Sequence, residues 1–140
     1  MNKLSHTVWN NKYHIVFCTK YRKDILKGEV SQRVREITRQ ICEKQGVNII
    51  RGNVRKNHIH LLVMCPPHLS ISKLLHLIKG ISSRKIQMEF QFLRKQYWGK
   101  HIWSTGYFCS TVGDVSLETL ENYVENQNDE DEDDIFTVGY

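Results

Sequence analysis

The segment 57–63, Asn-His-Ile-His-Leu-Leu-Val, constrains the fold more than any other part of the chain. Apolar and β-branched residues dominate it and neither Gly nor Pro interrupts it, which predicts a β-strand. Side chains alternate between the faces of a strand, so His58 and His60 share one face and the apolar residues share the other. Two adjacent neutral imidazoles suggest a bound cation. The alternative is a strand with two polar residues on its solvent face.

Length and composition predict one domain with a hydrophobic core, because the chain has 140 residues and a hydrophobic fraction of 40%. No apolar run approaches the roughly 20 residues that span a membrane. The first residues lack the apolar core of a signal peptide. The four cysteines are scattered without C-x-x-C spacing, which is typical of buried thiols in a reducing compartment. We therefore expect a cytoplasmic protein with no membrane partner.

The charge of the chain is unevenly distributed. The net charge is +5, but the segment 128–134 contains six acidic residues and no basic one. Residues 1–127 therefore carry 20 basic and 9 acidic side chains, a net charge of +11. A domain this basic favours a polyanion such as nucleic acid, although charge alone also serves solubility. We expect the acidic tail, 128–140, to be solvated and flexible; the alternative is that it shields a basic DNA surface.

Hydrophobic periodicity and breaking residues divide the domain, 1–127, into strands and helices. The expected elements, in chain order, are strand 13–18, helix 29–45, strands 47–54 and 57–63, helix 70–89, a β-rich segment 98–112 with a turn at Thr105-Gly106, and helix 116–127. Gly46 is expected to end one helix and Ser70 to cap the next. This order predicts an α+β fold, the ferredoxin-like split βαβ arrangement: an antiparallel sheet with two helices on one face, plus a C-terminal helix. His58 and His60 would then face the open side of the sheet.

Several aromatic and histidine side chains have a structural interpretation. We expect the large aromatic residues of segment 98–112 to belong to the core rather than to stack on bases (Trp98, Trp103, Tyr107 and Phe108). His14 is expected to be a hydrogen-bonded structural histidine within a strand. Gly80 costs its helix about 1 kcal/mol relative to Ala, and it either allows close approach of another backbone or is incidental.

A basic loop with an aromatic residue inside it follows the first strand. Lys20 and Arg22 would hold phosphates while Tyr21 stacks on a base, although a solvated turn is the simpler alternative. On the helix 70–89, we also predict DNA contacts for the polar and basic residues Lys79, Ser83 and Arg84.

The last expected helix carries two functional candidates four residues apart, Tyr123 and Gln127, which therefore share a face. If the apolar stripe of this helix docks on the open face of the sheet, both side chains reach His58 and His60. A Gln carbonyl oxygen is a reasonable third ligand for Mg²⁺ or Mn²⁺. Tyr123 would then be the nucleophile beside the metal, because a phenol attacks a phosphate once its proton is removed or its anion is stabilised.

These residues resemble the single-tyrosine HUH transposases of small bacterial and archaeal insertion sequences. The resemblance covers about residues 9–127 and depends on the order and spacing of its motifs. The motifs are Tyr13-His14-Ile15-Val16-Phe17, Thr19-Lys20-Tyr21-Arg22, His58-Ile59-His60-Leu61-Leu62-Val63, Pro66-Pro67, Ser72-Lys73-Leu74, Lys79-Gly80, Ser82-Ser83, Trp98-Gly99, Gly106-Tyr107-Phe108, Thr111-Val112-Gly113 and Tyr123-Val124-Glu125-Asn126-Gln127.

The resemblance implies a prokaryotic, metal-dependent enzyme that cleaves and rejoins single-stranded DNA beside hairpins at the ends of an insertion sequence. It implies Tyr123 as the nucleophile that becomes linked to a 5′ phosphate. It also implies His58, His60 and Gln127 as ligands of Mg²⁺ or Mn²⁺, and no nucleotide cofactor. It further implies a homodimer in which the tyrosine helix of one chain completes the histidine site of the other, with Gly113 as a natural hinge.

The chain departs from the family pattern at two places. Lys56-Asn57 precedes the histidines where the family often has an acidic residue, which leaves open any charged role beside the ligands. Ile71 replaces a frequent proline. Two other functions remain as alternatives: a host-domesticated relative that acts on repeated palindromes, and a non-catalytic nucleic-acid-binding module of the same fold. The second lacks the K/R-G-F/Y-G/A-F-V-x-F/Y signature of RNA-recognition domains.

Overall fold

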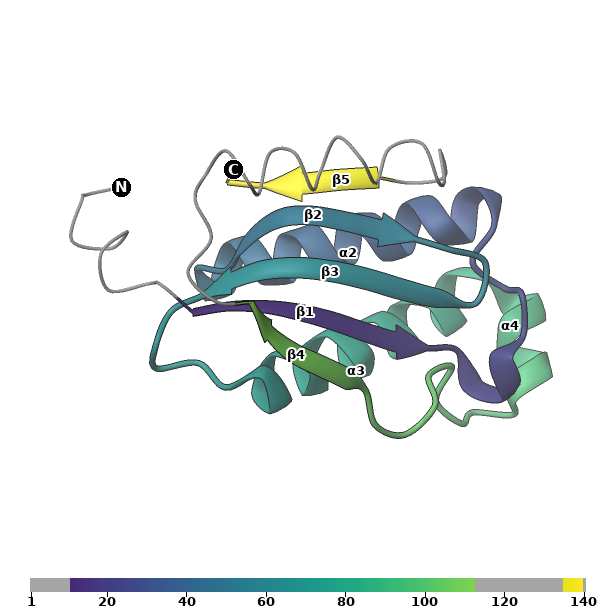
Figure 1. Ribbon diagram of the computed structural model, residues 1–140. Helices are drawn as coiled ribbons and strands as arrows, with labels where there is room; N and C mark the ends of the chain where they lie inside the picture. The colour runs from purple at the N-terminus through teal and green to yellow at the C-terminus, as the bar shows by residue number, and fades with distance from the viewer. Residues whose placement is uncertain (1–10, 113–134, 140) are drawn as a thin grey trace.

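The computed structural model describes residues 11–112 and 135–139 of the chain. Its strands are β1 (Asn11–Cys18), β2 (Asn48–Val54), β3 (His58–Cys65), β4 (Phe108–Val112) and β5 (Ile135–Val138). Its helices are α2 (Gly28–Gln45), α3 (Ile71–Glu89), α4 (Gln91–Tyr97) and the short 3₁₀ helix η1 (Lys20–Arg22). The strands form one antiparallel sheet in the order β4-β1-β3-β2-β5 (Figure 1). The expected α+β fold is confirmed.

The core lies between one face of this sheet and the helices α2 and α3, which both run behind the sheet in Figure 1. The alternating apolar residues of β3 contribute to it, and Ile59, Leu61 and Val63 have no exposed surface. The predicted stripe of α2 packs against them, with Val34 fully buried and Ile37 nearly so. Because the two helices cover this face, the alternate positions of each strand point to the opposite face, where Ile50 and Leu62 form a second, smaller buried cluster.

The helix ends follow the expected sequence signals. Ser70 Oγ accepts a hydrogen bond of 3.1 Å from the backbone N–H of Lys73 and so caps α3. Ile71 is the first residue of this helix, so the absence of proline there does not prevent the helix from starting. Gly46 ends α2 at φ 73°, a left-handed conformation, and its N–H donates to the carbonyls of Cys42 and Glu43.

The segment before β4 differs from the prediction. Residues 91–97 form helix α4, and the strand begins only at Phe108. Trp103 is buried as predicted, with its Nε1–H donating to Ser82 Oγ over 2.9 Å. Three aromatic residues predicted in the core are instead exposed: Trp98 by 86%, Tyr107 by 43% and Phe108 by 60%. Trp98 lies at the end of α4, and Phe108 begins the edge strand β4. Neither of these two side chains is enclosed by a second layer of structure.

The prediction of a flexible C-terminal tail is wrong for residues 135–138. These residues form β5, which pairs with the outer edge of β2, and Phe136 and Val138 are each only 7% exposed. The ring of Phe136 lies over Gly52, where a Cβ atom would come within 2.5 Å of the ring carbons. Four residues that include three apolar ones, Ile-Phe-Thr-Val, are sufficient here to add a strand at the edge of the sheet. Residues 113–134, including the expected helix 116–127 and the hinge at Gly113, lie outside the described residues.

Within the described part of the chain, no helix has the length and apolar character that crossing a membrane requires.

Candidate metal centre

Strand β3 places His58 and His60 side by side on the face of the sheet opposite α2 and α3. Their ring centroids lie 5.0 Å apart, and both side chains are half-buried. In the antiparallel pairing with β1, His58 lies opposite Cys18 and His60 lies opposite Val16. The shared face that the sequence predicts for the two imidazoles is therefore present in the structure.

Asn57 determines how the ring of His58 is presented. Asn57 Oδ1 lies 2.7 Å from His58 Nδ1. Because an amide oxygen only accepts hydrogen bonds, Nδ1 carries the proton and donates it, and Nε2 is the ring nitrogen that carries the lone pair. Asn57 thus provides an uncharged hydrogen-bond acceptor for the ring of His58.

His14 approaches the pair from the neighbouring strand. Its Nε2 lies 3.4 Å from His60 Nδ1, and the two ring centroids are 5.5 Å apart. The sequence predicts a structural role for His14 and does not connect it with the pair. The proximity of His14 to His60 follows only from strand pairing, because the register of β1 against β3 puts both on the same face of the sheet.

The environment favours the neutral form of His60 and of His14. Burial lowers the pKa of His60 to about 4, with further lowering by the nearby charges of His58, His14 and Arg55. Burial also lowers the pKa of His14. A neutral imidazole offers a nitrogen lone pair at physiological pH, which is the form that binds a metal ion.

A buried amide adds an oxygen donor beside the histidines. Asn53 of β2 lies directly opposite His60 and is 5% exposed, and its Oδ1 has no hydrogen-bond partner among the described residues. Two imidazoles and an amide oxygen form a mixed nitrogen and oxygen donor set, which suits Mn²⁺ and is compatible with Mg²⁺. The described ranges contain no cluster of three or more His, Cys, Asp or Glu residues able to hold a metal. The residues present therefore fit a divalent ion whose remaining ligands are oxygens.

The predicted nucleophile Tyr123 and third ligand Gln127 lie outside the described residues, so their assignment remains a prediction from the sequence.

The predicted DNA-binding residues are divided between the surface and the interior. Tyr21 and Arg22 are exposed in η1, Lys20 is half-buried beside them, and Arg84 is exposed on α3. Lys79 instead donates through Nζ to the carbonyls of Ser104 and Gly106. The prediction for Ser83 needs correction. Its side chain is 2% exposed, and its Oγ accepts hydrogen bonds from the N–H of Ile102 and from Gln87 Nε2, so it holds α3 to the segment before β4.

The class of protein follows from comparison with known families. A family model described as "Transposase IS200 like" matches residues 7–127, and the chain belongs to this family. The chain is 38% identical over 128 residues to the transposase for insertion sequence element IS200 of Salmonella typhimurium, covering 91% of this chain and 84% of that protein. It is 30% identical over 131 residues to the ISDra2 transposase TnpA of Deinococcus radiodurans, covering 94% of each.

Solved structures agree with the fold. A crystal structure from Deinococcus radiodurans R1, described as that of a transposase, superposes with a TM-score of 0.67 at 30% identity, covering 83% of this chain and 89% of that chain. A REP-associated tyrosine transposase bound to a REP hairpin superposes with a TM-score of 0.60 at 13% identity, covering 84% of this chain and 64% of that chain. At that identity the second likeness supports the fold alone.

Proposed function

We propose that this IS200-like transposase cleaves and rejoins single-stranded DNA at the hairpin-bearing ends of an insertion sequence through a covalent phosphotyrosine. The observation that carries the proposal is the pair of imidazoles, His58 and His60, held side by side on the face of the sheet opposite α2 and α3, with the pKa of His60 lowered to about 4. Family membership and the position of Tyr123 and Gln127 in the sequence support the remaining assignments.

In this proposal, the Oη atom of Tyr123 attacks the scissile phosphorus. The bond between phosphorus and the 3′ oxygen breaks, the phenol loses its proton, and the leaving oxygen gains one to become a 3′ hydroxyl. The tyrosine is left bonded to the 5′ phosphate. Rejoining is the reverse reaction with another 3′ hydroxyl, so the energy of the phosphodiester is kept and no nucleotide cofactor is consumed.

His58, His60 and Gln127 would hold Mg²⁺ or Mn²⁺. A divalent ion bound there polarises the scissile phosphate and stabilises charge on the leaving oxygen. Asn57 orients the ring of His58 through Nδ1, and His14 contacts Nδ1 of His60. In the tautomer in which His60 Nδ1 donates to His14 Nε2, the Nε2 of His60 would bind the ion. Asn53, with its unused oxygen opposite His60, is placed to accept a hydrogen bond from a water molecule at the same site.

The experiment that tests this function is covalent trapping. Wild-type protein with Mn²⁺ and a labelled single strand containing the element's own end is expected to give an adduct that survives a denaturing gel. Tyr123→Phe should abolish the adduct while leaving DNA binding nearly intact, and Tyr107→Phe, a matched change at an exposed tyrosine, should retain it. An adduct that persists in Tyr123→Phe would refute the assignment of the nucleophile.

The metal assignment is tested with the same adduct. His58→Ala and His60→Ala should each remove it, whereas His76→Ala, an exposed histidine on α3, should not. Gln127→Ala should weaken cleavage less, because water can replace one oxygen ligand. Excess chelator should stop cleavage and spare much of the DNA binding, which depends on Lys and Arg. Undiminished cleavage in chelator would exclude the metal.

A further inference from the structure

Strained backbone conformations are concentrated at one end of the molecule. Tyr21 (φ 62°), Arg22 (φ 52°) and Trp98 (φ 52°) are the non-glycine residues with positive φ among the residues that the structure describes. Residues with a Cβ rarely adopt this left-handed region, because the side chain crowds the following carbonyl. Such strain persists where the surrounding structure imposes it, and it is frequent at functional sites.

Packing of the side chains does not offset this strain, because two of the three are large aromatic residues in solvent. Trp98 is 86% exposed and Tyr21 is 67% exposed. Trp98 occupies the position after α4 where a helix ordinarily ends with glycine, and a glycine follows it. A tryptophan at this position makes the left-handed backbone less stable than a glycine would, and its side chain is not buried against the described residues.

The two aromatic residues belong to one surface. The Oη of Tyr97, the residue before Trp98, lies 3.4 Å from the carbonyl oxygen of Lys20, the residue before Tyr21. Lys23 Nζ lies 5.7 Å from the ring centroid of Tyr21 and the same distance from that of Tyr97. In Figure 1, α4 and the bend after β1 occupy the same end of the molecule.

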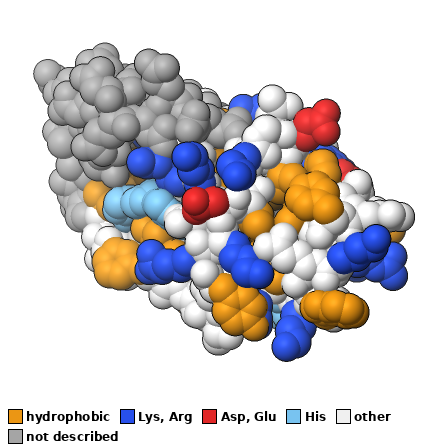
Figure 2. Space-filling model, turned by 90° about the vertical axis from the view of Figure 1, so that its right-hand side faces the viewer, with side chains coloured by type: hydrophobic (Ala, Val, Ile, Leu, Met, Phe, Trp, Pro, Cys, Tyr) orange, Lys and Arg blue, Asp and Glu red, His pale blue; other side chains and the backbone are white. Residues whose placement is uncertain are grey.

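Cations surround this surface, with an acidic side chain among them in Figure 2. Figure 2, which faces this end, shows Lys and Arg side chains between exposed hydrophobic ones. Arg94 lines two neighbouring pockets of about 330 and 510 Å³, the second of which also includes Lys95 and Trp98. Ion pairs in the described part of the chain involve Arg33 and leave these cations without an acidic partner.

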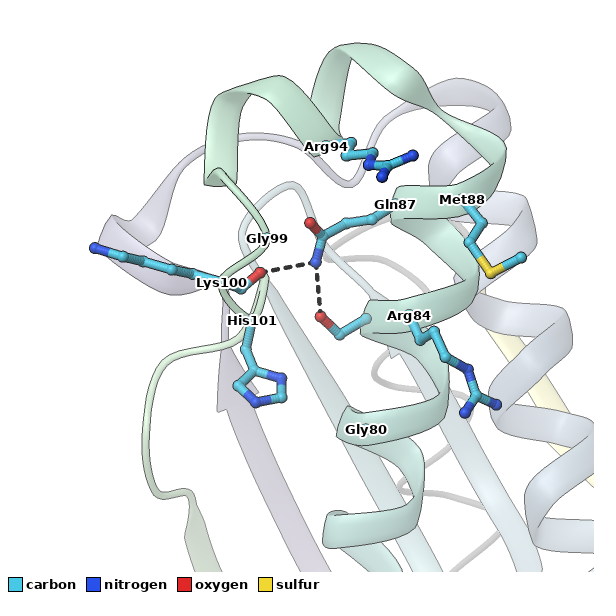
Figure 3. A pocket seen from close by; sticks show the side chains of 9 residues that line it. Gly80, Arg84, Gln87, Met88, Arg94, Gly99, Lys100 and His101 are labelled. Atoms are coloured by element: carbon cyan, nitrogen blue, oxygen red, sulfur yellow. Dashed lines mark hydrogen bonds between the residues drawn. The ribbon is translucent and has the colours of Figure 1, made fainter.

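The smaller pocket has an ordered polar floor. Gln87 Nε2 donates to the carbonyl oxygen of Lys100 over 2.8 Å and to Ser83 Oγ over 3.1 Å, which fixes the amide between α3 and the loop after α4. Arg94 lies on one side of this amide and Arg84 on the other (Figure 3). The positive rim is thus built on two helices rather than on a free loop.

We propose that this stacking surface, formed by Tyr21, Trp98, Arg94, Lys95 and Lys100, binds unpaired nucleotides of the DNA substrate. The rings of Tyr21 and Trp98 stack on bases, and the three cations contact phosphates, which is the combination that binds single strands without reading their sequence. The inference rests on the proposed function, because that function supplies DNA as the substrate.

The stacking surface is continuous with the histidine site through the backbone. The N–H of Thr19 donates to the carbonyl of Asn57 over 2.9 Å, so the turn that carries Tyr21 is fastened next to the residue that orients His58. A strand held on Tyr21 and Trp98 therefore lies at the end of the sheet where His58 begins β3. This surface would hold the single strand that flanks the scissile phosphate.

The test measures DNA binding by the full chain in a Tyr123→Phe background, so that cleavage does not influence the result. The probes are a fluorescein-labelled 20-nucleotide deoxythymidine strand and a blunt duplex. Trp98→Ala and Tyr21→Ala are each expected to weaken binding of the single strand about tenfold and to leave binding of the duplex within about twofold. Phe92→Ala, a 61% exposed aromatic on α4 with ordinary backbone angles, is the matched control and should bind as the parent does.

A second variant distinguishes a binding role from a structural one. Trp98→Gly should raise the melting temperature, because glycine relieves the left-handed backbone, while still losing single-strand affinity. A structural role for Trp98 predicts a lower melting temperature instead. Arg94→Ala and Lys95→Ala should weaken binding of both probes and reduce the salt dependence of binding. Arg39→Ala, which changes an exposed residue of α2, should have a smaller effect on both.

The outcomes separate this inference from the proposed function. If the parent protein does not bind the single strand at all, the proposed function fails. If it binds and the variants Trp98→Ala and Tyr21→Ala bind equally well, only the stacking surface is refuted. Equal losses in Phe92→Ala would refute it as well, and a change of oligomeric state in Trp98→Ala would assign the surface to a second copy of the chain.

Discussion

Asn57 Oδ1 and His58 Nδ1 are 2.7 Å apart, and this hydrogen bond between neighbouring residues fixes which nitrogen of His58 carries the proton. Residues that orient a ligand in this way typically change metal affinity 10- to 100-fold when they are removed. Asn57→Ala is therefore expected to lower Mn²⁺ affinity by about tenfold, measured by titration calorimetry without DNA.

Two variants accompany that measurement. Asn57→Asp keeps the acceptor and should bind Mn²⁺ at least as tightly as the wild type, whereas Lys56→Ala changes an exposed neighbour and should leave affinity unchanged. Wild-type affinity in Asn57→Ala would show that the hydrogen bond does not control the ligand.

We predict an active site shared between two chains, with His58 and His60 from one and Tyr123 and Gln127 from the other. Tyr123→Phe and His58→Ala, each inactive alone, should recover cleavage when co-expressed, because a mixed dimer contains one intact combination. Strands β4 and β5, which precede and follow residues 113–134, both pair within one sheet. Failure of rescue in verified mixed dimers would place the site within one chain.

Gly52 is expected to be essential for the docking of β5. An added Cβ would meet the Phe136 ring at 2.5 Å, so Gly52→Ala should lower the free energy of unfolding by about 1–3 kcal/mol in urea titrations. Combining it with Phe136→Val should cost less than the two single changes together, because the smaller side chain removes the clash.

Gly80→Ala is the matched control for this glycine change. An added Cβ there meets nothing within 4 Å, so alanine should stabilise α3 by up to about 1 kcal/mol. A stable Gly52→Ala protein would indicate that β5 is not docked on β2 in solution.

Two buried thiols predict alkaline sensitivity. Burial raises the pKa of both Cys42 and Cys65 to about 12, from an ordinary value near 9. Below pH 9 the two thiols keep their protons in both the folded and the unfolded chain. Between about pH 9 and 12 only the unfolded chain loses it, so stability should fall as pH rises through this range. Mass spectrometry should find both thiols alkylated slowly in native protein at pH 8.5 and rapidly in urea; equal rates would contradict their burial.

The sequence by itself determined the elements from β1 to α3 and the shared face of His58 and His60, but not α4 or β5. Both follow from local periodicity: alternation in residues 57–63 and the apolar stripe of α2 require no knowledge of distant contacts. Cap signals at Gly46 and Ser70 are equally local, and both are confirmed.

Only the tertiary structure decided which further residues join the site and the surface. His14 and Asn53 reach His60 through the register of β1 and β2 against β3, and register depends on pairing between distant segments. Trp98 and Trp103 have the same composition signal, but one ends a helix in solvent and the other packs on Phe17. Strand β5 likewise depended on an available edge and on a glycine at position 52, since four apolar-alternating residues become a strand only where a partner strand leaves its hydrogen-bonding groups open.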